Sequence, residues 1–471
     1  MRKDSLPNTH LILSPVHQAA LAFPQQTAIK RAGQYISYSE LSQRVIALNQ
    51  QLSAVGISQG QSLACVASNS MEMICLYWAC IDIGAIFFPI SPRFPLTQIQ
   101  GLIDEHRIGY FWSKENTELQ HCRLLDLDFE CVSNDLPQPI DVSRPANVIL
   151  TSGSSGFPKA AVHRLANHIA NAEGARSLIA LEQGDAWLLS LPLFHIGGLA
   201  ILNRCALVGA CVVMPDHALT LSQQIDQDKL SHLSLVPAQL NKLLTDTSSK
   251  LESIKALLLG GGAVSINLLT QLKQRNIASY TSYGMTEMGS QITTGPALSD
   301  GSSGKLLPKR ELKIKDGVIW VRGACLFMGY LTPDGIQACV DQDSWFYTKD
   351  RGEWDENGNL RILGRVDNMF ISGGENIQPE EIEAALKLHP QIDDAIVFAI
   401  PDDKFGHLPA AIIRGSLARQ PEAITSELEL FLADKIARFK RPRHYYPWPE
   451  SSEQTGLKVN RKSLIASLIQ G

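Results

Sequence analysis

A run of small hydroxyl and glycine residues that ends an apolar stretch is the place where this sequence first suggests chemistry. Residues 148–162 read VILTSGSSGFPKAAV. The glycines allow a close backbone approach and positive φ angles, the hydroxyl groups donate hydrogen bonds, and Lys159 adds a positive charge. The hydroxyl and glycine residues are Thr151, Ser152, Gly153, Ser154, Ser155 and Gly156. This combination suits phosphate oxygens, and it predicts a strand that runs into a phosphate-binding loop.

The familiar glycine-rich nucleotide motifs do not fit this loop. The Walker spacing requires a glycine five residues after Gly153, where the sequence has Pro158. No G-x-G-x-x-G follows the strand either. A Ser/Gly-rich turn that only joins two elements is the common alternative, so the rest of the sequence must separate the two interpretations.

A histidine and an arginine stand near another predicted strand end. His195 lies in PLFHIGG, directly after the strand-like residues 187–191. Ligands of open α/β sheets bind at strand ends, although a lone histidine is as often hydrogen-bonded inside a core. Arg204 follows in the next helical pattern, where it would suit a second carboxylate on a substrate or simply lie on the surface. Two further strand ends carry LLLGGG at residues 257–262 and YTSYGMTE at residues 280–287.

The order of the apolar patterns predicts how these segments are positioned. Ser37 and Glu40 have the spacing of a helix capping box, and apolar residues at helical spacing follow until Gly56. From there to about residue 260, helical patterns alternate with short apolar runs, which is typical of parallel α/β layers. We therefore expect an α/β fold whose large N-terminal domain contains layered α/β subdomains.

The pattern changes in the last third of the chain. Residues 311–321 and 354–363 each read as two strands around an Asp-Gly or Asn-Gly turn, so a small antiparallel β region is expected. Helical patterns at 379–388 and 425–438, together with further strands, predict a small mobile α+β domain at the C-terminus. We place the boundary within residues 365–368. The expected domains are residues 1–366 and 367–471.

Composition excludes several classes of protein. The 471 residues carry a formal net charge of −5, and no basic block is long enough to follow a nucleic-acid backbone. The nine cysteines contain no C-x-x-C pair, as expected for thiols in a reducing cytoplasm. The apolar window 71–90 contains Glu72 and Asp82, so a buried helix and strand are expected there. We expect small-molecule substrates, no nucleic-acid partner and no stable membrane insertion, while homo-oligomerisation stays open.

Five stretches resemble, in order, the motifs of the adenylate-forming superfamily, which includes acyl-CoA synthetases, luciferases and peptide-synthetase adenylation domains. They are TSGSSGFPK from Thr151, YGMTE from Tyr283, YTKDRGE from Tyr347, GRVD from Gly364 and GLKVNR from Gly456. Lys349 replaces the glycine of the family's usual Y-x-T-G-D, and Leu457 separates Gly456 from Lys458. The resemblance favours the phosphate-loop interpretation of the first stretch over a simple turn.

This resemblance implies roles for the residues that match the nucleotide motifs. It implies that Tyr283 stacks on adenine, that Thr286 contacts the α-phosphate and that Glu287 coordinates magnesium. It also implies that Asp350 accepts hydrogen bonds from both ribose hydroxyls and that Arg365 approaches the ribose. The remaining ATP-binding residues that it implies are Thr151, Ser152, Gly153, Ser154, Ser155, Gly156, Lys159, Gly261 and Gly284.

The same resemblance implies how the acid and CoA are handled. Asp367 would be the hinge between the domains, and the loop containing Gly373 and Gly374 would line the CoA channel. Lys458 would be the catalytic lysine, and His195 would border the acyl pocket and take part in catalysis. The other residues considered for the acyl pocket are Arg204, Gly260 and Ser282.

Within the superfamily, the block GRVDNMFISGGENIQPEEIE is most similar to the o-succinylbenzoate–CoA ligases of menaquinone biosynthesis. The implied reaction uses ATP, Mg²⁺ and CoA to form an acyl-adenylate and then a thioester. Three alternatives stay open at this point. They are a CoA ligase for another aromatic or medium-chain acid, an enzyme that loads a carrier protein, and a non-catalytic nucleotide-binding protein.

Overall fold

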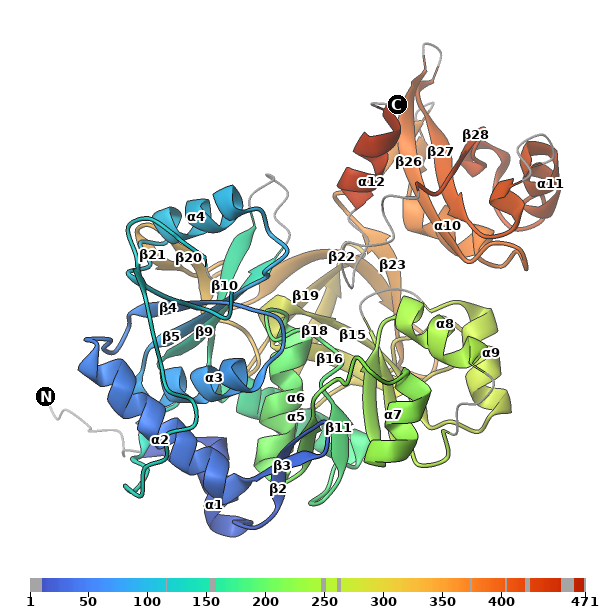
Figure 1. Ribbon diagram of the computed structural model, residues 1–471. Coiled ribbons are helices and arrows are strands. Elements are labelled where there is room, and N and C mark those ends of the chain that lie inside the picture. The colour runs from blue at the N-terminus through green and yellow to red at the C-terminus, as the bar shows by residue number, and fades with distance from the viewer. Residues whose placement is uncertain are drawn as a thin grey trace, which may run out of the picture.

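The protein is described here by a computed structural model (Figure 1). The described residues are 11–115, 117–151, 158–246, 251–260, 264–372, 375–402, 405–419, 424–449 and 461–469. Two large mixed sheets with helices against them form most of the chain, and a smaller four-stranded sheet follows. A separate α+β unit, orange to red in Figure 1, ends it. This arrangement confirms the α/β fold class.

A nine-stranded sheet carries two of the motifs with candidate site residues. Its central strands are parallel, and its edges are antiparallel. In spatial order the strands are β17 (Lys305–Leu306), β16 (Ser290–Pro296), β15 (Ser279–Met285), β14 (Ala256–Leu259), β13 (His232–Leu235), β11 (Ala186–Leu188), β12 (Cys211–Val213), β2 (Thr27–Arg31) and β3 (Gln34–Ser37). The associated helices are α5 (Leu165–Ile179), α6 (Ile196–Val208), α7 (Leu221–Asp228), α8 (Pro237–Thr245) and α9 (Ile266–Gln274). The parallel arrangement predicted from alternating patterns is confirmed.

An eight-stranded sheet carries both ends of the predicted phosphate loop. In spatial order its strands are β21 (Gly335–Gln337), β20 (Gly329–Thr332), β10 (Lys159–Arg164), β9 (Pro145–Thr151), β5 (Ile86–Ile90), β4 (Ser62–Val66), β6 (Tyr110–Ser113) and β7 (Arg123–Leu124). The preceding helices and a small strand pair are α1 (Pro15–Ala22), α2 (Tyr38–Ala54), α3 (Met71–Ile83), α4 (Leu96–Glu105), β1 (Leu11–Ile12) and β8 (Ile140–Asp141). Because β9 and β10 are antiparallel, the predicted loop is the connection of a hairpin.

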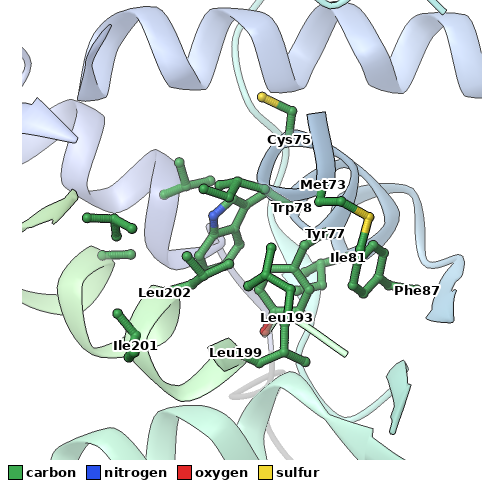
Figure 2. Close-up of a cluster of buried hydrophobic side chains, with 14 of the residues drawn as sticks. Met73, Cys75, Tyr77, Trp78, Ile81, Phe87, Leu193, Leu199, Ile201 and Leu202 are labelled. Carbon is green, nitrogen blue, oxygen red and sulfur yellow. The ribbon is translucent and has the colours of Figure 1, made fainter. Parts of the chain in front are cut away.

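The apolar window 71–90 forms the predicted buried helix and strand. Figure 2 shows Tyr77 and Trp78 of α3 close to Leu199 and Leu202 of α6, so this core joins elements far apart in sequence. No helix in the described parts of the chain is long and apolar enough to cross a membrane.

The predicted antiparallel region is a four-stranded sheet. Its strands are β18 (Arg310–Lys315), β19 (Val318–Gly323), β22 (Phe346–Trp354) and β23 (Leu360–Arg365). Asp316 and Gly317 have φ angles of 54° and 73°, as a tight hairpin turn requires. The second predicted turn is wider, because Trp354 pairs with Leu360 across it.

The C-terminal unit has apolar cores of its own. Its elements are β24 (Phe370–Ser372), β25 (Glu375–Ile377), α10 (Pro379–Leu386), β26 (Asp394–Asp402), β27 (Gly406–Arg414), α11 (Ile424–Phe431), β28 (His444–Pro447) and α12 (Arg461–Ile469). The prediction of a helix to residue 438 was wrong, since α11 ends at Phe431. The Arg441 guanidinium donates to the carbonyl groups of Ala433 and Ile436, which satisfies backbone acceptors beyond the helix end.

The first turn of α6 packs directly against the chain that leads into it. A methyl group added to Gly198 would lie 2.2 Å from the carbonyl oxygen of Pro192. A methyl group on Gly197 would meet the Leu191 Cδ1 atom at 2.7 Å, which is the end of a flexible side chain. The position of His195, the N-cap residue of α6, therefore depends on the glycine at 198.

We predict that Gly198→Ala lowers the free energy of unfolding by about 1–3 kcal/mol, because rigid backbone atoms must move to admit the methyl group. Gly197→Ala should cost clearly less, since the Leu191 side chain can rotate. Urea unfolding curves of the two variants and the wild type measure the difference. Equal effects of the two substitutions would contradict the packing argument.

Candidate active site

The two ends of the predicted phosphate loop face each other across the hairpin of β9 and β10. Thr151 and Lys159 are directly paired, and the Thr151 hydroxyl donates to the Lys159 carbonyl oxygen at 3.4 Å. Lys159 is exposed at the start of β10. Ser152, Gly153, Ser154, Ser155 and Gly156 lie outside the described residues.

Glu287 lies in a short 3₁₀ turn, Thr286–Met288, between β15 and β16. Glu287 is only 8% exposed, and the Tyr330 hydroxyl donates to Glu287 Oε1 at 2.7 Å. The Lys159 Nζ atom lies 4.8 Å from the centre of the Tyr330 ring. Burial, followed by the nearby Glu287 charge, raises the pKa of Tyr330, so its hydroxyl keeps its proton. The structure thus brings Lys159 and Glu287 together around a tyrosine.

Tyr330 was not among the predicted site residues, because it stands alone on a short strand without a spacing that indicates chemistry. The usable signal was its place next to a glycine in the segment GYLT. That signal is weak without the pairing of β20 and β10, in which Tyr330 lies opposite Ala161.

The backbone of the Glu287 turn is held by a buried histidine. The His163 Nε2 atom donates to the Thr286 carbonyl oxygen at 2.7 Å. Burial lowers the pKa of His163 to about 4, despite hydrogen bonds to backbone oxygens that favour the charged form. The neighbouring His168 ring is 5.4 Å away, centre to centre, and burial also lowers its pKa. Both rings are therefore neutral near pH 7.

A chain of polar contacts joins Tyr283 to the predicted hinge. The Tyr283 hydroxyl donates to Asp350 Oδ2 at 2.7 Å, and Arg365 Nη1 donates to Asp350 Oδ1 at 2.8 Å. Arg365 also donates to Asp367 Oδ1 through Nε at 2.8 Å. Burial alone would raise the pKa of Asp367, but the Arg365 hydrogen bond and charge outweigh burial and lower it. Residues from the YGMTE, YTKDRGE and GRVD motifs therefore meet in one network.

Lys349 replaces the glycine of the family's usual Y-x-T-G-D, and the structure shows how it is accommodated. Its φ angle is 64°, a left-handed conformation that glycine adopts readily and other residues rarely do. The Lys349 Nζ atom lies 3.8 Å from Asp367 Oδ2. The backbone geometry that suits glycine is thus retained, and the lysine adds a charge near Asp367, the predicted hinge residue.

Arg204 is buried, which contradicts the alternative of a surface arginine. The residue is 4% exposed, and its Nη2 atom donates to the amide oxygens of Gln291 at 2.6 Å and Asn171 at 3.2 Å. No carboxylate of the described chain pairs with Arg204, and its Nε atom has no hydrogen-bond partner there. Burial, followed by the nearby charge of Arg310, lowers the pKa of Arg204 to about 10. A cation held only by neutral groups is suited to an incoming anion.

The remaining acyl-pocket candidates lie at the start of α6 and around the end of β14. His195 is exposed, with its ring edge against Phe194 at 4.9 Å between ring centres. Ser282 Oγ donates to the Leu259 carbonyl oxygen at 3.2 Å, next to Gly260. Gly284 pairs with Gln291, a partner of Arg204, which links this region to the YGMTE motif.

Several predicted site residues lie outside the described part of the chain. They are Gly261, Gly373, Gly374 and Lys458, together with most of the phosphate loop. The described part of the chain contains no group of three or more metal-binding side chains. Glu287 is a hard oxygen ligand, and Mg²⁺ bound together with phosphate groups needs only one or two carboxylates. The residues present therefore fit a magnesium ion that a nucleotide brings with it.

Comparisons with known proteins agree with this arrangement. Residues 16–331 match the family described as AMP-binding enzyme, and residues 381–456 match the AMP-binding enzyme C-terminal domain. A 2-succinylbenzoate–CoA ligase of Haemophilus influenzae is 36% identical over 436 residues, which is 92% of each chain.

Solved structures extend this similarity to the three-dimensional fold. A variant of E. coli MenE with bound OSB-AMS has a TM-score of 0.86 and 31% identity, covering 98% of this chain and 99% of that one. The o-succinylbenzoate CoA synthetase (MenE) of Bacillus subtilis in complex with ATP and magnesium has a TM-score of 0.84 and 27% identity, covering 93% and 96%.

Because His163 is buried and its pKa is lowered, we predict that the free energy of unfolding depends on pH. Its pKa is about 4 in the folded protein against 6.5 for an unperturbed histidine, so unfolding takes up a proton between these values. Its contribution to stability is complete above pH 6.5 and is lost as the pH falls to about 4, a change on the order of 3 kcal/mol. Urea unfolding midpoints between pH 4 and 7 should be less pH-dependent in His163→Gln. His121→Gln, at an exposed position, is the control, and an unchanged pH dependence in His163→Gln would refute this assignment.

Proposed function

The chain belongs to the family of AMP-binding enzymes, and on this premise we propose that it activates o-succinylbenzoate with ATP and transfers the acyl group to CoA. In the first half-reaction the substrate carboxylate attacks the α-phosphate, which releases pyrophosphate and forms the acyl-adenylate. In the second, the CoA thiol displaces AMP and gives o-succinylbenzoyl-CoA for menaquinone biosynthesis. The observation that carries this proposal is the agreement, over almost the whole chain, with 2-succinylbenzoate–CoA ligases.

The first half-reaction must bring an anion to a polyanion, so positive charge and hydrogen-bond donors are needed at the phosphates. We assign this role to Lys159, Thr286 and the hydroxyl and glycine residues from Thr151 to Gly156. Glu287 would hold Mg²⁺, whose chemistry is to neutralise charge on the phosphate oxygens. The low exposure of Glu287 supports this, because a carboxylate shielded from water interacts strongly with a cation.

The network around Asp350 supports a nucleotide site at the same place. We assign adenine stacking to Tyr283, and contacts with the ribose to Asp350 and Arg365. Tyr283 and Arg365 hold one Asp350 oxygen each, which fixes the direction of this carboxylate before a ribose arrives. Gly261 would allow the nucleotide to approach the backbone closely, and we also assign Gly284 to the nucleotide site, although a methyl group there would meet the Ser290 carbonyl oxygen at 2.1 Å.

In the second half-reaction, the CoA thiol must reach the site at which a lysine acts in the first. We propose that Lys458 acts in adenylation, that rotation at Asp367 then removes it, and that the loop of Gly373 and Gly374 lines the entry of CoA. The domain division at 366 and 367 is part of this proposal. The apolar cores of the C-terminal unit support it, because they allow that unit to move as one body.

The substrate carries a second carboxylate, and we propose that Arg204 holds it, with His195, Gly260 and Ser282 along the acyl pocket. Taking a guanidinium out of water is costly unless an anion or strong acceptors meet it. Arg204 has two neutral amide acceptors, while its Nε atom is buried without a partner among the described groups. A substrate carboxylate would supply the negative charge and the hydrogen-bond acceptor that Arg204 lacks among the described groups.

The protein contains only free cysteines at all nine positions, and we propose that it works in the reducing cytoplasm. Its proposed partners are the small molecules ATP, CoA and the acid.

A panel of acids tests the proposed function. We expect CoA-dependent AMP release with ATP and Mg²⁺ to be much faster with o-succinylbenzoate than with benzoate, cinnamate or octanoate, because only the first has a second carboxylate in reach of Arg204. If another acid is preferred, that acid becomes the proposed substrate and the proposed mechanism still applies. Absence of pyrophosphate exchange with every acid would refute the catalytic function.

Arg204→Gln tests the recognition of the second carboxylate. We expect the KM for o-succinylbenzoate to rise at least tenfold, equivalent to about 1.4 kcal/mol of lost binding, while the weaker use of benzoate changes little. Steady-state kinetics with both acids give this comparison. Arg176→Gln is the control, because Arg176 is an exposed arginine on α5. An equal loss with both acids would assign Arg204 to structure rather than recognition.

A further inference from the structure

Tyr330 contacts both charged residues at the proposed phosphate and magnesium site. Its hydroxyl donates to Glu287 Oε1 at 2.7 Å, and its ring centre lies 4.8 Å from Lys159 Nζ. Lys159 and Glu287 do not form an ion pair with each other in the described chain, although both lie against the same tyrosine. Tyr330 therefore contacts both a cation and an anion, the first through its ring and the second through its hydroxyl.

The Tyr330 ring is held in place from several directions. Its strand, β20, lies between β10 and β21, and Tyr330 is paired with Ala161 and Gln337. The Phe327 ring packs edge-on against it at 5.0 Å between centres. The preceding Gly329 has a φ of 143°, and an added methyl group there would lie 2.1 Å from the Gln337 carbonyl oxygen. The backbone around the tyrosine thus leaves little freedom to move.

The same segment is tied to both charged residues through the backbone. The Phe327 N–H donates to the Glu287 carbonyl oxygen at 2.8 Å, and the Met328 N–H donates to the Val162 carbonyl oxygen of β10 at 2.9 Å. Movement of this segment would therefore displace Glu287 and the strand that begins at Lys159 together.

We propose that Tyr330 is a positioning residue for magnesium-dependent ATP binding. Its hydroxyl fixes the orientation of the Glu287 carboxylate, and its ring keeps Lys159 beside the site without letting it neutralise Glu287. A direct ion pair between these residues would withdraw the lysine from phosphate and the carboxylate from Mg²⁺. This inference rests on the proposed role of Glu287. Loss of a group that orients a metal-binding carboxylate typically weakens metal affinity about 10–100-fold.

Tyr330→Phe tests the hydroxyl while keeping the ring beside Lys159 and Phe327. Calorimetric titration of the full-length protein with ATP, without acid or CoA, at a series of Mg²⁺ concentrations gives the Mg²⁺ needed for half-maximal ATP affinity. We expect this concentration to rise about 10–100-fold, while the affinity for AMP without metal stays within about twofold. Tyr110→Phe, in β6 of the same sheet, is the matched control and should change neither quantity.

A double-mutant cycle separates positioning from a general effect on the fold. In a Glu287→Gln background, Tyr330→Phe should change Mg²⁺-dependent ATP binding less than about threefold, because the oriented carboxylate is already gone. Equal effects in both backgrounds, no effect of Tyr330→Phe, or wild-type ATP binding that does not depend on Mg²⁺ would each overturn the inference. These measurements contain no acid, so they stand independently of whether o-succinylbenzoate is the substrate.

Discussion

The hydrogen bonds that hold the turn Thr286–Met288 between the two large sheets are the interactions on which the site depends. The turn follows β15 of the nine-stranded sheet, but its carbonyl groups accept from His163 of β10 and from Phe327 just before β20. Both of those strands belong to the eight-stranded sheet. Because the contacts are buried, water cannot replace them, and losing one would leave an unsatisfied carbonyl group that costs about 1–3 kcal/mol. The orientation of Glu287 is therefore set by the packing of the sheets rather than by the local sequence.

Charge is distributed differently in two parts of the site. Arg204 and Arg310 are both buried and are held by neutral groups, chiefly the side chains and carbonyl oxygens of Asn171 and Gln291. Arg365 is instead partly exposed and pairs with two carboxylates. Burying a cation without an acid costs solvation free energy, and an anion bound beside it would offset that cost. Arg365 already has its acids, so it suits the orientation of Asp350, whereas Arg204 suits the binding of an incoming anion.

Much of the local structure could be predicted from the sequence, because it depends on neighbouring residues. Ser37 Oγ accepts the Glu40 N–H at 3.2 Å as the capping pattern predicts, although the Glu40 side chain pairs with Arg44 instead of closing the box. Features that depend on contacts between residues far apart in the sequence could not be predicted in this way. The end of α11 depends on Arg441. The role inferred for Tyr330 depends on its contacts with Glu287, 43 residues earlier in the chain, and with Lys159, which is farther back still. The burial of Arg204 likewise follows from the crossing of α6 with α5 and β16, which spacing alone does not specify.

The contacts at the proposed hinge differ in burial from those that hold the Glu287 turn, and this difference bears on which parts can move. The Arg365 and Asp367 side chains are 41% and 35% exposed, and ion pairs this open to water contribute only about 0–1 kcal/mol each. Exchanging such contacts for hydration or for new partners therefore changes the energy little. His163 is fully buried, and breaking its bond to the Thr286 carbonyl would expose neither group to water. The proposed rotation at Asp367 would thus leave the turn that carries Glu287 fixed, which is what two half-reactions at one nucleotide site require.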